Sequence, residues 1–325
     1  MMRAILNRRY GAADDLQLAE IDAPALEPDH VVVRIRAASV NAGDWRLMRG
    51  WPRIARPMMG GLRGPSPPVR GWDLAGVVES VADGVEGFRP GDEVFGTGAA
   101  TFAELATARA DTLAPKPAGL SFEVASAIGV AGVSALQALR DRAHVKAGQR
   151  VLVTGAGGGV GTFAVQLAKL YGAEVTAVCS AAKADLVAEL GADRVIDYAT
   201  DDFTRDRGRY DVIFDIASAR SIHATRRALT PDGTLIVVAR KGNLIGPIGR
   251  IAKVVILKPF VRRQTLMPFL AHPTRADLLD LANLVDAGKL RVAIDRTWDF
   301  ADAPAAIRYV EEGRVRGKAV VVVAR

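Results

Sequence analysis

The chain has 325 residues, of which half are hydrophobic and 24% charged, and its 43 Lys and Arg against 36 Asp and Glu give a net charge of +7. This balance is typical of a globular protein of about two domains and excludes an intrinsically disordered chain. The basic residues are scattered and only 6% of residues are aromatic, so no nucleic-acid partner is expected. The positive charge suits either a solvated surface or a site for a phosphate-rich cofactor. The single cysteine, Cys179, excludes an internal disulfide and a four-cysteine zinc site.

The first part of the chain, to about residue 116, predicts a β-rich domain. Residues 1–10 read as a short strand that carries three arginines. They lack the apolar core of a signal peptide, so the cytoplasm is the expected location. Further apolar runs at 31–35, 76–78 and 92–96 are separated by Gly and Pro and predict β-strands. The Gly- and Pro-rich stretch 60–71 is expected to be an irregular loop.

From about residue 120 the pattern changes to alternating helices and strands. Ser121 is a candidate N-cap for an Ala-rich helix that extends to about residue 139. Strands are expected at 151–153, 174–179, 194–196, 211–216 and 234–239, helices at 162–171, 184–190 and 224–229, and a turn at 231–233. This alternation predicts a parallel, doubly wound α/β sheet.

The tail returns to the style of the opening. A helix at about 274–287, a strand near 292–294, a short helix near 302–312 and a last strand at 319–323 are expected. The predicted domains are therefore 1–119 for the first part of the β-rich domain, 120–266 for the doubly wound domain and 267–325 for the return.

The strongest motif is the Gly-rich run that follows the strand at 151–153 and opens a helix. It matches a dinucleotide-binding fingerprint in which Gly158 lets the backbone approach a pyrophosphate and Gly161 lets the helix pack closely. Ala156 occupies the first glycine position, with Gly155 just before it. The backbone amides at the helix start, including Gly159 and Val160, are expected to hold phosphate together with the helix dipole.

The end of the second strand of this domain predicts which nicotinamide cofactor is bound. NAD-preferring sites place an acid about 20 residues beyond the fingerprint to accept the ribose hydroxyls. Here Ser180 stands at that distance and Lys183 follows it. A hydroxyl and a cation suit the 2′-phosphate of NADP(H), although the same residues also fit a helix cap and an ordinary surface cation.

Several motifs in order carry a family resemblance that covers nearly the whole chain. They are ASVNAGDW at 38–45, GWDLAGVV at 71–78, GDEVFG at 91–96, VKAGQR at 145–150, LGAD and VIDY within 190–198, and RGKAVV at 316–321. With the Gly-rich turn, they resemble the zinc-independent quinone oxidoreductase branch of the medium-chain dehydrogenase/reductase superfamily.

The resemblance implies a GroES-like catalytic domain and a Rossmann domain, with a homodimer formed through the latter. It also implies that Tyr198 lies near the 2′-phosphate and that Ser134 lies near the nicotinamide. Arg316 and Lys318 stand where the tail of the family approaches the cofactor, and the alternative for both is surface charge that flanks the last strand.

No metal site is expected. Zinc-dependent relatives carry a Cys and a Gly-His-Glu segment where this chain has 41–44 and 71–73, without a thiolate or an imidazole. The four histidines are scattered without ligand spacing; they are His30, His144, His223 and His272.

The expected activity is hydride transfer from NADPH to a quinone or an α,β-unsaturated carbonyl compound. Asn41 is the first candidate to orient the nicotinamide carboxamide or the substrate carbonyl. Asp44 is the second, as a polar anchor or part of a proton route, and its alternative is a helix cap after Gly43. Rival functions are a zinc-free alcohol dehydrogenase, an enoyl reductase, and a non-catalytic NADPH-binding regulator.

Two further groups of residues have open interpretations. Trp45, Met48 and Trp51 fit either an apolar substrate wall or the core of a small domain. Residues 244–263 are apolar with interspersed cations, and residues 248, 251, 252, 255 and 256 fall on one helical face. This segment suits a lid, an interface helix, or a basic patch that touches a membrane surface.

Overall fold

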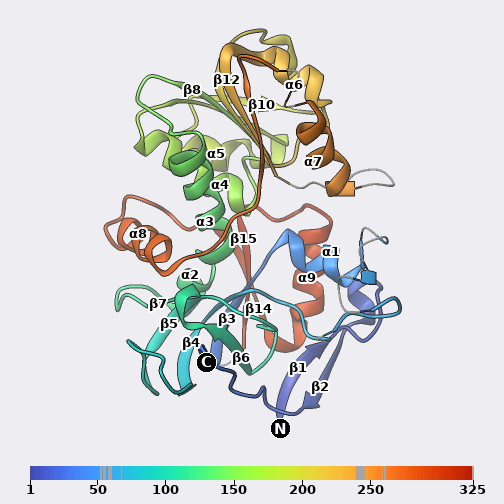
Figure 1. Ribbon diagram of the computed structural model, residues 1–325, viewed down its shortest axis with the longest axis vertical. Coiled ribbons are helices and arrows are strands. Elements are labelled where there is room, and N and C mark those ends of the chain that lie inside the picture. The colour runs from blue at the N-terminus through green and yellow to red at the C-terminus, as the bar shows by residue number, and fades with distance from the viewer. Residues whose placement is uncertain are drawn as a thin grey trace. The chain divides into compact units, whose positions relative to one another are not determined.

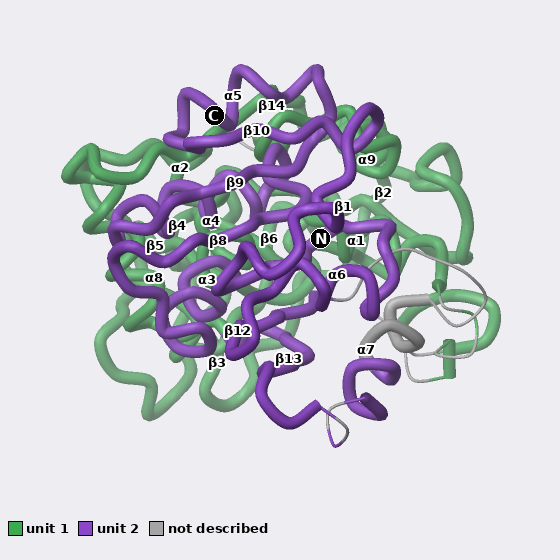
Figure 2. The backbone as a smooth tube through the Cα atoms, turned by 90° about the horizontal axis from the view of Figure 1, so that it is seen from above, with its two compact units in different colours: residues 1–133, 273–325 green, residues 134–272 purple. Residues whose placement is uncertain are grey.

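The computed structural model describes residues 1–51, 53, 56–57, 61–66, 68–238, 246–257, 259 and 261–323, with side chains inside 246–257 described from residue 252 onward. It contains two compact units (Figure 2). Unit 1 comprises Met1–Val133 and Pro273–Arg325, and unit 2 comprises Ser134–His272. The doubly wound part of the chain therefore interrupts the β-rich part, as the sequence pattern predicts.

Unit 1 is built on a mainly antiparallel sheet. Its strands are β1 (Met2–Leu6), β2 (Gln17–Ile21), β3 (His30–Val40), β4 (Asp73–Val81), β5 (Glu93–Thr97), β6 (Leu105–Arg109), β7 (Leu113–Pro115), β14 (Ile294–Asp299) and β15 (Lys318–Val322). Its helices are α1 (Ala42–Met48), α2 (Phe122–Ser126), α8 (Arg275–Asp286) and α9 (Ala303–Glu311) (Figure 1). The large sheet has the order β14-β15-β3-β4-β5-β7 with β6 beside β3, and β1 and β2 form a separate antiparallel pair.

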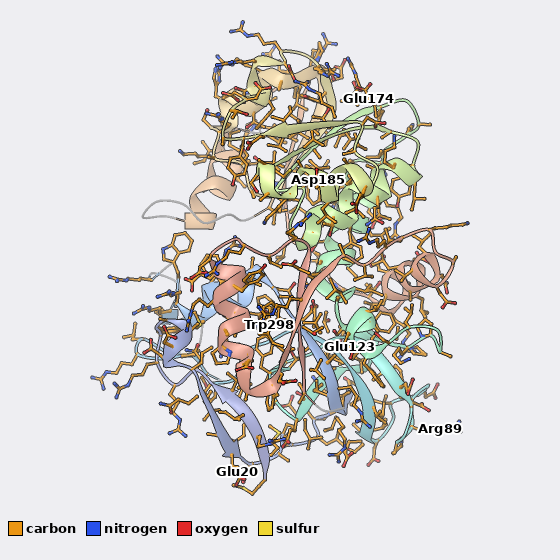
Figure 3. All side chains as sticks on the ribbon, turned by 180° about the vertical axis from the view of Figure 1, so that it is seen from behind. Glu20, Arg89, Glu123, Glu174, Asp185 and Trp298 are labelled. Atoms are coloured by element: carbon orange, nitrogen blue, oxygen red, sulfur yellow. The ribbon has the colours of Figure 1, made fainter. Side chains whose placement is uncertain are left out.

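The core of unit 1 forms because alternate residues of these strands are apolar and point inward. Val31, Val33 and Ile35 of β3 are fully buried in one cluster with Trp298 of β14. Charged side chains such as those of Glu20 and Arg89 point away from the ribbon (Figure 3).

Unit 2 is a doubly wound α/β domain. Its strands are β8 (Arg150–Thr154), β9 (Glu174–Cys179), β10 (Arg194–Asp197), β11 (Tyr210–Asp215), β12 (Leu229–Val238) and β13 (Thr265–Phe269). Its helices are α4 (Gly159–Leu170), α5 (Ala184–Glu189), α6 (Ile222–Ala228) and α7 (Gly246–Leu257), and α3 (Gly129–Gln137) crosses the boundary from unit 1 before a π-helical segment, Ala138–Arg142.

All neighbouring strands of unit 2 run parallel in the order β10-β9-β8-β11-β12-β13. Numbered along unit 2, this is the order 3-2-1-4-5-6 of dinucleotide-binding sheets. The order reverses between β8 and β11, so the carboxyl ends of these two strands mark the expected ligand crevice.

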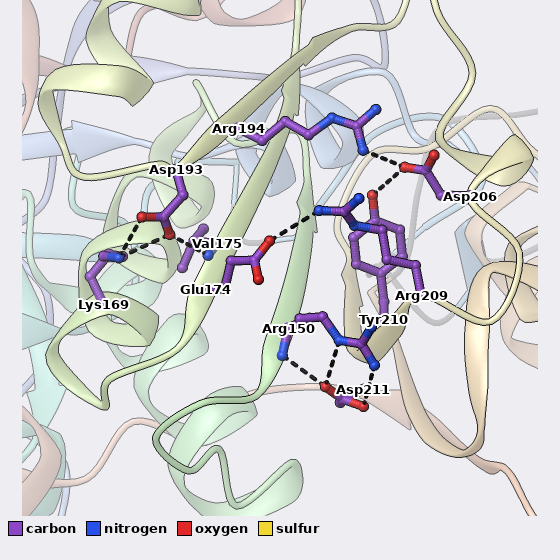
Figure 4. A network of polar contacts seen from close by, with 10 residues as sticks. All are labelled: Arg150, Lys169, Glu174, Val175, Asp193, Arg194, Asp206, Arg209, Tyr210 and Asp211. Carbon is purple, nitrogen blue, oxygen red and sulfur yellow. Dashed lines mark hydrogen bonds and ion pairs between the residues drawn. The ribbon is translucent and has the colours of Figure 1, made fainter.

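The amino ends of the same strands carry mutually paired charges (Figure 4). Arg150 donates from its backbone N–H and its guanidinium to Asp211, at 2.8 and 3.4 Å. Lys169 contacts Asp193 at 2.8 Å. A further pair, Arg194 and Asp206, has an N···O distance of 2.6 Å. Because the described charges at the amino ends of the strands pair with one another, these ends stabilise the sheet. The carboxyl ends of the strands remain for a ligand.

The structure refines two local predictions. The single helix expected from Ser121 to about 139 is interrupted, because α2 ends at Ser126 and α3 begins at Gly129. The interruption lets the backbone N–H of Val130 donate to the carboxylate of Asp73 at 2.7 Å. The turn expected at 231–233 lies within β12, where Leu229 pairs with Tyr210 and Thr234 pairs with Val212, so the residues between them loop out of the strand ladder. Pro231 lacks an N–H and fits such an irregular position.

The boundaries between the units also differ from the predicted 119/120 and 266/267. Residues 120–133 belong to unit 1 because α2 packs on its sheet, with Ala127 beside Ala37 and Val320. Residues 267–272 belong to unit 2 because β13 is the edge strand of its sheet and pairs with β12.

The segment at 244–263 contains α7, the crossover helix between β12 and β13. Val254 is fully buried in the core of unit 2, whereas Val255 and Ile256 are exposed. Two residues of the predicted apolar face, 248 and 251, have side chains outside the described part of the chain. Residues 244 and 245, at the start of the segment, lie outside it entirely. Among the described helices, none is long and apolar enough to cross a bilayer.

Candidate functional site

Strand pairing in unit 1 brings three distant polar residues together. Strand β3 runs antiparallel to β15, with Val40 opposite Ala319, and antiparallel to β4 on its other side. The residue after β3, Asn41, therefore meets the first residues of β4 and β15, which are Asp73 and Lys318. Gly317 makes this arrangement possible, because its φ of +91° and its close approach to the backbone of Ala293 leave no room for a side chain.

The three side chains form one buried hydrogen-bonded cluster with Ser39. The Nδ2 of Asn41 donates to Asp73 Oδ2 at 2.8 Å, and Lys318 Nζ donates to Asn41 Oδ1 at 2.9 Å. Lys318 Nζ also contacts Asp73 Oδ2 at 3.1 Å, and Ser39 Oγ donates to the same oxygen at 2.6 Å. We call Ser39, Asn41, Asp73 and Lys318 the amide cluster.

The start of α3 completes the surroundings of Asp73. Its other oxygen, Oδ1, accepts the N–H of Val130 at 2.7 Å. A Cβ on Gly129 would lie 2.4 Å from Oδ1, so the glycine is what lets the helix terminus approach. The positive end of the helix dipole favours a carboxylate there.

Asp44 lies beside this cluster and is almost fully buried. Its Oδ2 accepts the backbone N–H of Asn41 at 2.7 Å, which caps α1 as the structural alternative in the sequence predicts. Burial raises the pKa of Asp44 to about 7, and the nearby Asp73 carboxylate adds to the rise against the opposing effects of the Asn41 N–H, Lys318 and Arg70. Its Oδ1 has no hydrogen-bond partner among the described residues. The carboxyl therefore gains and loses its proton near neutral pH.

The Gly-rich turn of unit 2 follows β8 at the point where the strand order reverses. A Cβ on Gly161 would lie 2.3 Å from the carbonyl oxygen of Gly155, so tight packing of α4 requires this glycine. A Cβ on Gly158 would meet only an ordinary 3.4 Å contact. The missing side chain of Gly158 therefore leaves space for an approaching ligand rather than for the protein itself.

The helix that opens at this turn presents its first N–H groups there. No side chain caps α4 at Gly158, and the first N–H groups of a helix, here those of Gly159, Val160 and Gly161, have no partner within it. Such N–H groups and the helix dipole fit a phosphate group. The turn thus fits the pyrophosphate of a dinucleotide.

Lys183 and Ser180 lie next to the same turn. A Cβ on Gly157 would collide with the aliphatic part of Lys183 at 2.7 to 2.8 Å, so the Lys183 side chain lies over the turn. The backbone N–H of Tyr198 donates to the carbonyl of Cys179 at 3.1 Å, which brings Tyr198 beside Ser180. Tyr198 is 60% exposed. The structure therefore brings Ser180, Lys183 and Tyr198 together with the predicted residues of the turn, which are Gly158, Gly159, Val160 and Gly161.

The remaining predicted residues lie elsewhere. Ser134 is buried in α3. Arg316 is exposed, and its backbone N–H donates to Asp295 at 3.0 Å. Lys318 is not a surface charge, because it is almost fully buried in the amide cluster. Trp45 and Met48 belong to the core of unit 1, and Trp51 is partly exposed.

The sequence interpretation missed two polar groups. It cited Asp73 only as part of a motif, and the signal that was available is an acid at the first position of a strand, directly after Gly-Trp. It also missed Asp215, whose carboxylate accepts from Thr154 Oγ1 at 2.9 Å and from the N–H of Ser218 at 3.0 Å. This contact joins the carboxyl ends of β8 and β11 beside the Gly-rich turn. Within the described residues, no three His, Cys, Asp or Glu are grouped to hold a metal ion.

Comparison with known proteins gives consistent results for both units. The alcohol dehydrogenase GroES-like domain family matches residues 27–118, and the zinc-binding dehydrogenase family matches residues 190–321. The chain is 31% identical to the chloroplast envelope quinone oxidoreductase homolog of Arabidopsis thaliana, over 99% of this chain and 98% of that one. It is 31% identical to the 2-methylene-furan-3-one reductase of Solanum lycopersicum, over 98% and 79% of the two chains.

Among solved structures, the quinone oxidoreductase from Coxiella burnetii has a TM-score of 0.89 and 28% identity, with 99% of each chain covered. The chain belongs to the quinone oxidoreductase branch of the medium-chain dehydrogenase/reductase superfamily. Unit 1 is accordingly its GroES-like domain and unit 2 its Rossmann domain. The protein is an oxidoreductase that uses a nicotinamide cofactor and a small-molecule substrate.

The raised pKa of Asp44 predicts a specific pH dependence of stability. Its pKa is about 7 in the folded protein against 3.8 for a free side chain. Between these two pH values the carboxyl is protonated in the folded state and ionised in the unfolded state. The free energy of unfolding of the wild type, relative to Asp44→Asn, should therefore fall by about 3 kcal/mol between pH 5 and pH 8. Urea denaturation of both proteins at several pH values measures the difference.

A matched control is Asp232→Asn. Asp232 is exposed, and its hydrogen bonds from Arg263 lower its pKa. The free energy of unfolding of the wild type relative to Asp232→Asn should therefore not fall between pH 5 and pH 8, and Asp232→Asn should lose stability with rising pH as the wild type does. Parallel pH profiles for wild type and Asp44→Asn would contradict the account of Asp44.

Proposed function

We propose that the protein is an NADPH-dependent, zinc-free reductase that transfers hydride to quinones or α,β-unsaturated carbonyl compounds. The observation that carries the proposal is the Gly-rich turn at the start of α4, which no side chain caps and over which Lys183 lies at Gly157. The cofactor supplies the hydride when bound, so the protein has to bind, orient and stabilise charge.

The preference for NADPH rests on charge at the end of β9. Ser180 and the cation of Lys183 suit a 2′-phosphate, which an acid in their place would repel. Asp197 is the nearest acid by strand pairing, since it lies opposite Cys179. Its Oδ1 accepts the N–H of Ala199 at 3.0 Å, so this carboxylate stabilises the turn after β10.

The stabilisation of charge rests on Asn41. Hydride transfer to an enone or a quinone leaves negative charge on the oxygen of the substrate, and a fixed N–H donor stabilises that charge. Asn41 has two N–H donors, and among the described residues only one of them has an acceptor, which is Asp73. Asp44, with a carboxyl that titrates near neutral pH, is the adjacent candidate for a proton route.

A zinc-free mechanism is part of the proposal, although one of the matching families is described as zinc-binding. The segments in which zinc-dependent relatives carry their ligands are 41–44 and 71–73 in this chain, and their residues Asn41 and Asp73 belong to the amide cluster. The Asp73 carboxylate accepts hydrogen bonds from four groups, on Ser39, Asn41, Val130 and Lys318. A carboxylate so occupied is a poor metal ligand.

The cofactor preference is tested by Lys183→Ala. Loss of one charged contact to the 2′-phosphate should weaken NADPH binding about 10- to 100-fold and leave NADH binding nearly unchanged. Lys169→Ala is the control, because Lys169 pairs with Asp193 at the amino ends of the strands, away from the Gly-rich turn. Equal losses for both cofactors, or tighter NADH binding by the wild type, would refute the role of Lys183.

The role of Asn41 is tested by Asn41→Ala with a panel of quinones and enones. We expect kcat to fall about 100-fold or more because an oxyanion donor is lost, with NADPH affinity and melting temperature close to wild type. Unchanged turnover would remove Asn41 from the mechanism. Turnover of alcohols instead would favour a zinc-free alcohol dehydrogenase, and turnover of an enoyl substrate would favour an enoyl reductase. NADPH binding without any turnover would favour a non-catalytic regulator.

We also propose that α7 touches an anionic membrane surface. No Asp or Glu occurs between Asp232 and Asp277, while 244–263 contains five Lys or Arg residues. On the described part of the helix, Val255 and Ile256 are 54% and 64% exposed and lie beside the exposed Lys253. Of the five cations, Arg263 pairs with Asp232 at 2.7 Å. Exposed aliphatic residues among the other cations fit the boundary of an anionic bilayer.

Co-sedimentation with vesicles tests this contact. The wild type should bind vesicles that contain phosphatidylglycerol, less so at high salt, and Ile256→Glu should not bind. Leu279→Glu is the control, because Leu279 is an exposed leucine of α8 in unit 1. If Ile256→Glu instead lowers the mass in sedimentation velocity, the face belongs to the homodimer, and absence of vesicle binding by the wild type refutes the membrane contact.

A further inference from the structure

The amide cluster contains a buried pair of opposite charges that the proposed chemistry does not itself require. Asp73 is 0% and Lys318 2% exposed, and Ser39 is also fully buried. Asn41 is 9% exposed, so it is the member of the cluster that a ligand can reach. Any influence of Asp73 or Lys318 on a ligand therefore has to act through Asn41.

The charges discriminate between the two orientations of the Asn41 carboxamide. In the observed orientation the NH2 group faces the Asp73 carboxylate at 2.8 Å and the carbonyl oxygen faces the Lys318 ammonium at 2.9 Å. A flip by 180° would place the carbonyl oxygen against the carboxylate and the NH2 group against the ammonium. Both contacts would then be repulsive, because a carboxylate only accepts and an ammonium only donates hydrogen bonds.

The fixed orientation leaves a defined donor. One N–H of Asn41 is bonded to Asp73, and the second has no acceptor among the described residues. Because the amide cannot flip, this second N–H keeps one direction before substrate arrives. A donor that needs no reorganisation stabilises developing charge better than one that has to rotate into place.

We propose that Asp73 and Lys318 are positioning residues that hold the Asn41 carboxamide in a single orientation and so aim its free N–H at the substrate oxygen. The inference rests on the proposed function in one respect, the contact between Asn41 and the reacting groups. The buried ion pair then serves orientation, because paired apolar residues of similar volume stabilise a core at least as well.

Removing only one of the two buried charges would lower the stability of the protein strongly. Lys318→Met alone leaves the Asp73 carboxylate without its cation and endangers folding. The double variant Asp73→Asn with Lys318→Met removes both charges at nearly constant volume and keeps the fold accessible. Val321→Ala is the control, because Val321 is buried in the same strand as Lys318, so this variant lowers stability without changing the amide cluster.

The first readout is the side-chain amide signal of Asn41 in ¹⁵N–¹H NMR spectra, assigned by its absence in Asn41→Ala. The wild type and Val321→Ala should show two sharp and well separated protons that exchange slowly with solvent. In the double variant these signals should shift, broaden and exchange faster. An unchanged Asn41 signal in the folded double variant would overturn the inference, whatever the enzyme reduces.

The second readout is a double-mutant cycle on turnover. We expect the double variant to lower kcat about 10- to 100-fold, from loss of orientation, with KM for NADPH unchanged. On the Asn41→Ala background the same two substitutions should have no further effect on kcat. Equal losses on both backgrounds, or wild-type kcat in the double variant, would show that Asp73 and Lys318 are merely structural.

The two readouts separate the inference from the function on which it rests. If Asn41→Ala leaves turnover unchanged, the proposed role of Asn41 in the reaction fails, and with it the role of the pair in catalysis. The NMR signal still decides whether Asp73 and Lys318 hold the amide.

Discussion

A buried charge has to be matched by donors of its own, and in unit 1 this constraint determines much of the local structure. The Asp73 carboxylate requires the N–H of Val130, so the helix expected from Ser121 is broken before Gly129. It also requires the Lys318 ammonium, so the chain passes Ala293 through a glycine of positive φ just before β15. Leaving such a charge unpaired would cost several kcal/mol. The termini of β3, β4 and β15 thus meet at one polar point, and Asn41 is the part of it that reaches the surface.

Unit 2 separates stability from ligand binding by strand direction. The amino ends of its parallel strands carry arginine–aspartate pairs such as Arg150 with Asp211. The carboxyl ends carry the Gly-rich turn, Lys183 and the contact between Thr154 and Asp215. Since the turn follows β8, where the strand order reverses, the first N–H groups of α4 lie where a dinucleotide phosphate is expected. The same topology predicts that substitutions at the amino ends of the strands alter the stability of the protein more than its binding of a dinucleotide.

The sequence predicted the architecture and the Gly-rich turn that opens α4, because both depend on local signals. The Gly-rich turn, the alternation of helices and strands, and the roles of Gly158 and Gly161 follow from short motifs with a clear physical reason. The meeting of Asn41 with Asp73 and Lys318 could not be derived, because it depends on the register of strands far apart in the chain. For the same reason Lys318 was expected near the cofactor or at the surface and is found in a buried cluster. The edge strand β13 was missed because the apolar segment before it dominated the pattern.

The most direct test of the proposed function is to follow oxidation of NADPH and of NADH by the wild-type protein with a panel of quinones and enones, with and without a metal chelator. The account predicts turnover with NADPH that greatly exceeds turnover with NADH and that the chelator does not change. A preference for NADH would contradict the role given to Ser180 and Lys183. Loss of activity in the chelator, restored by added zinc, would contradict the zinc-free site at Asn41 and Asp73.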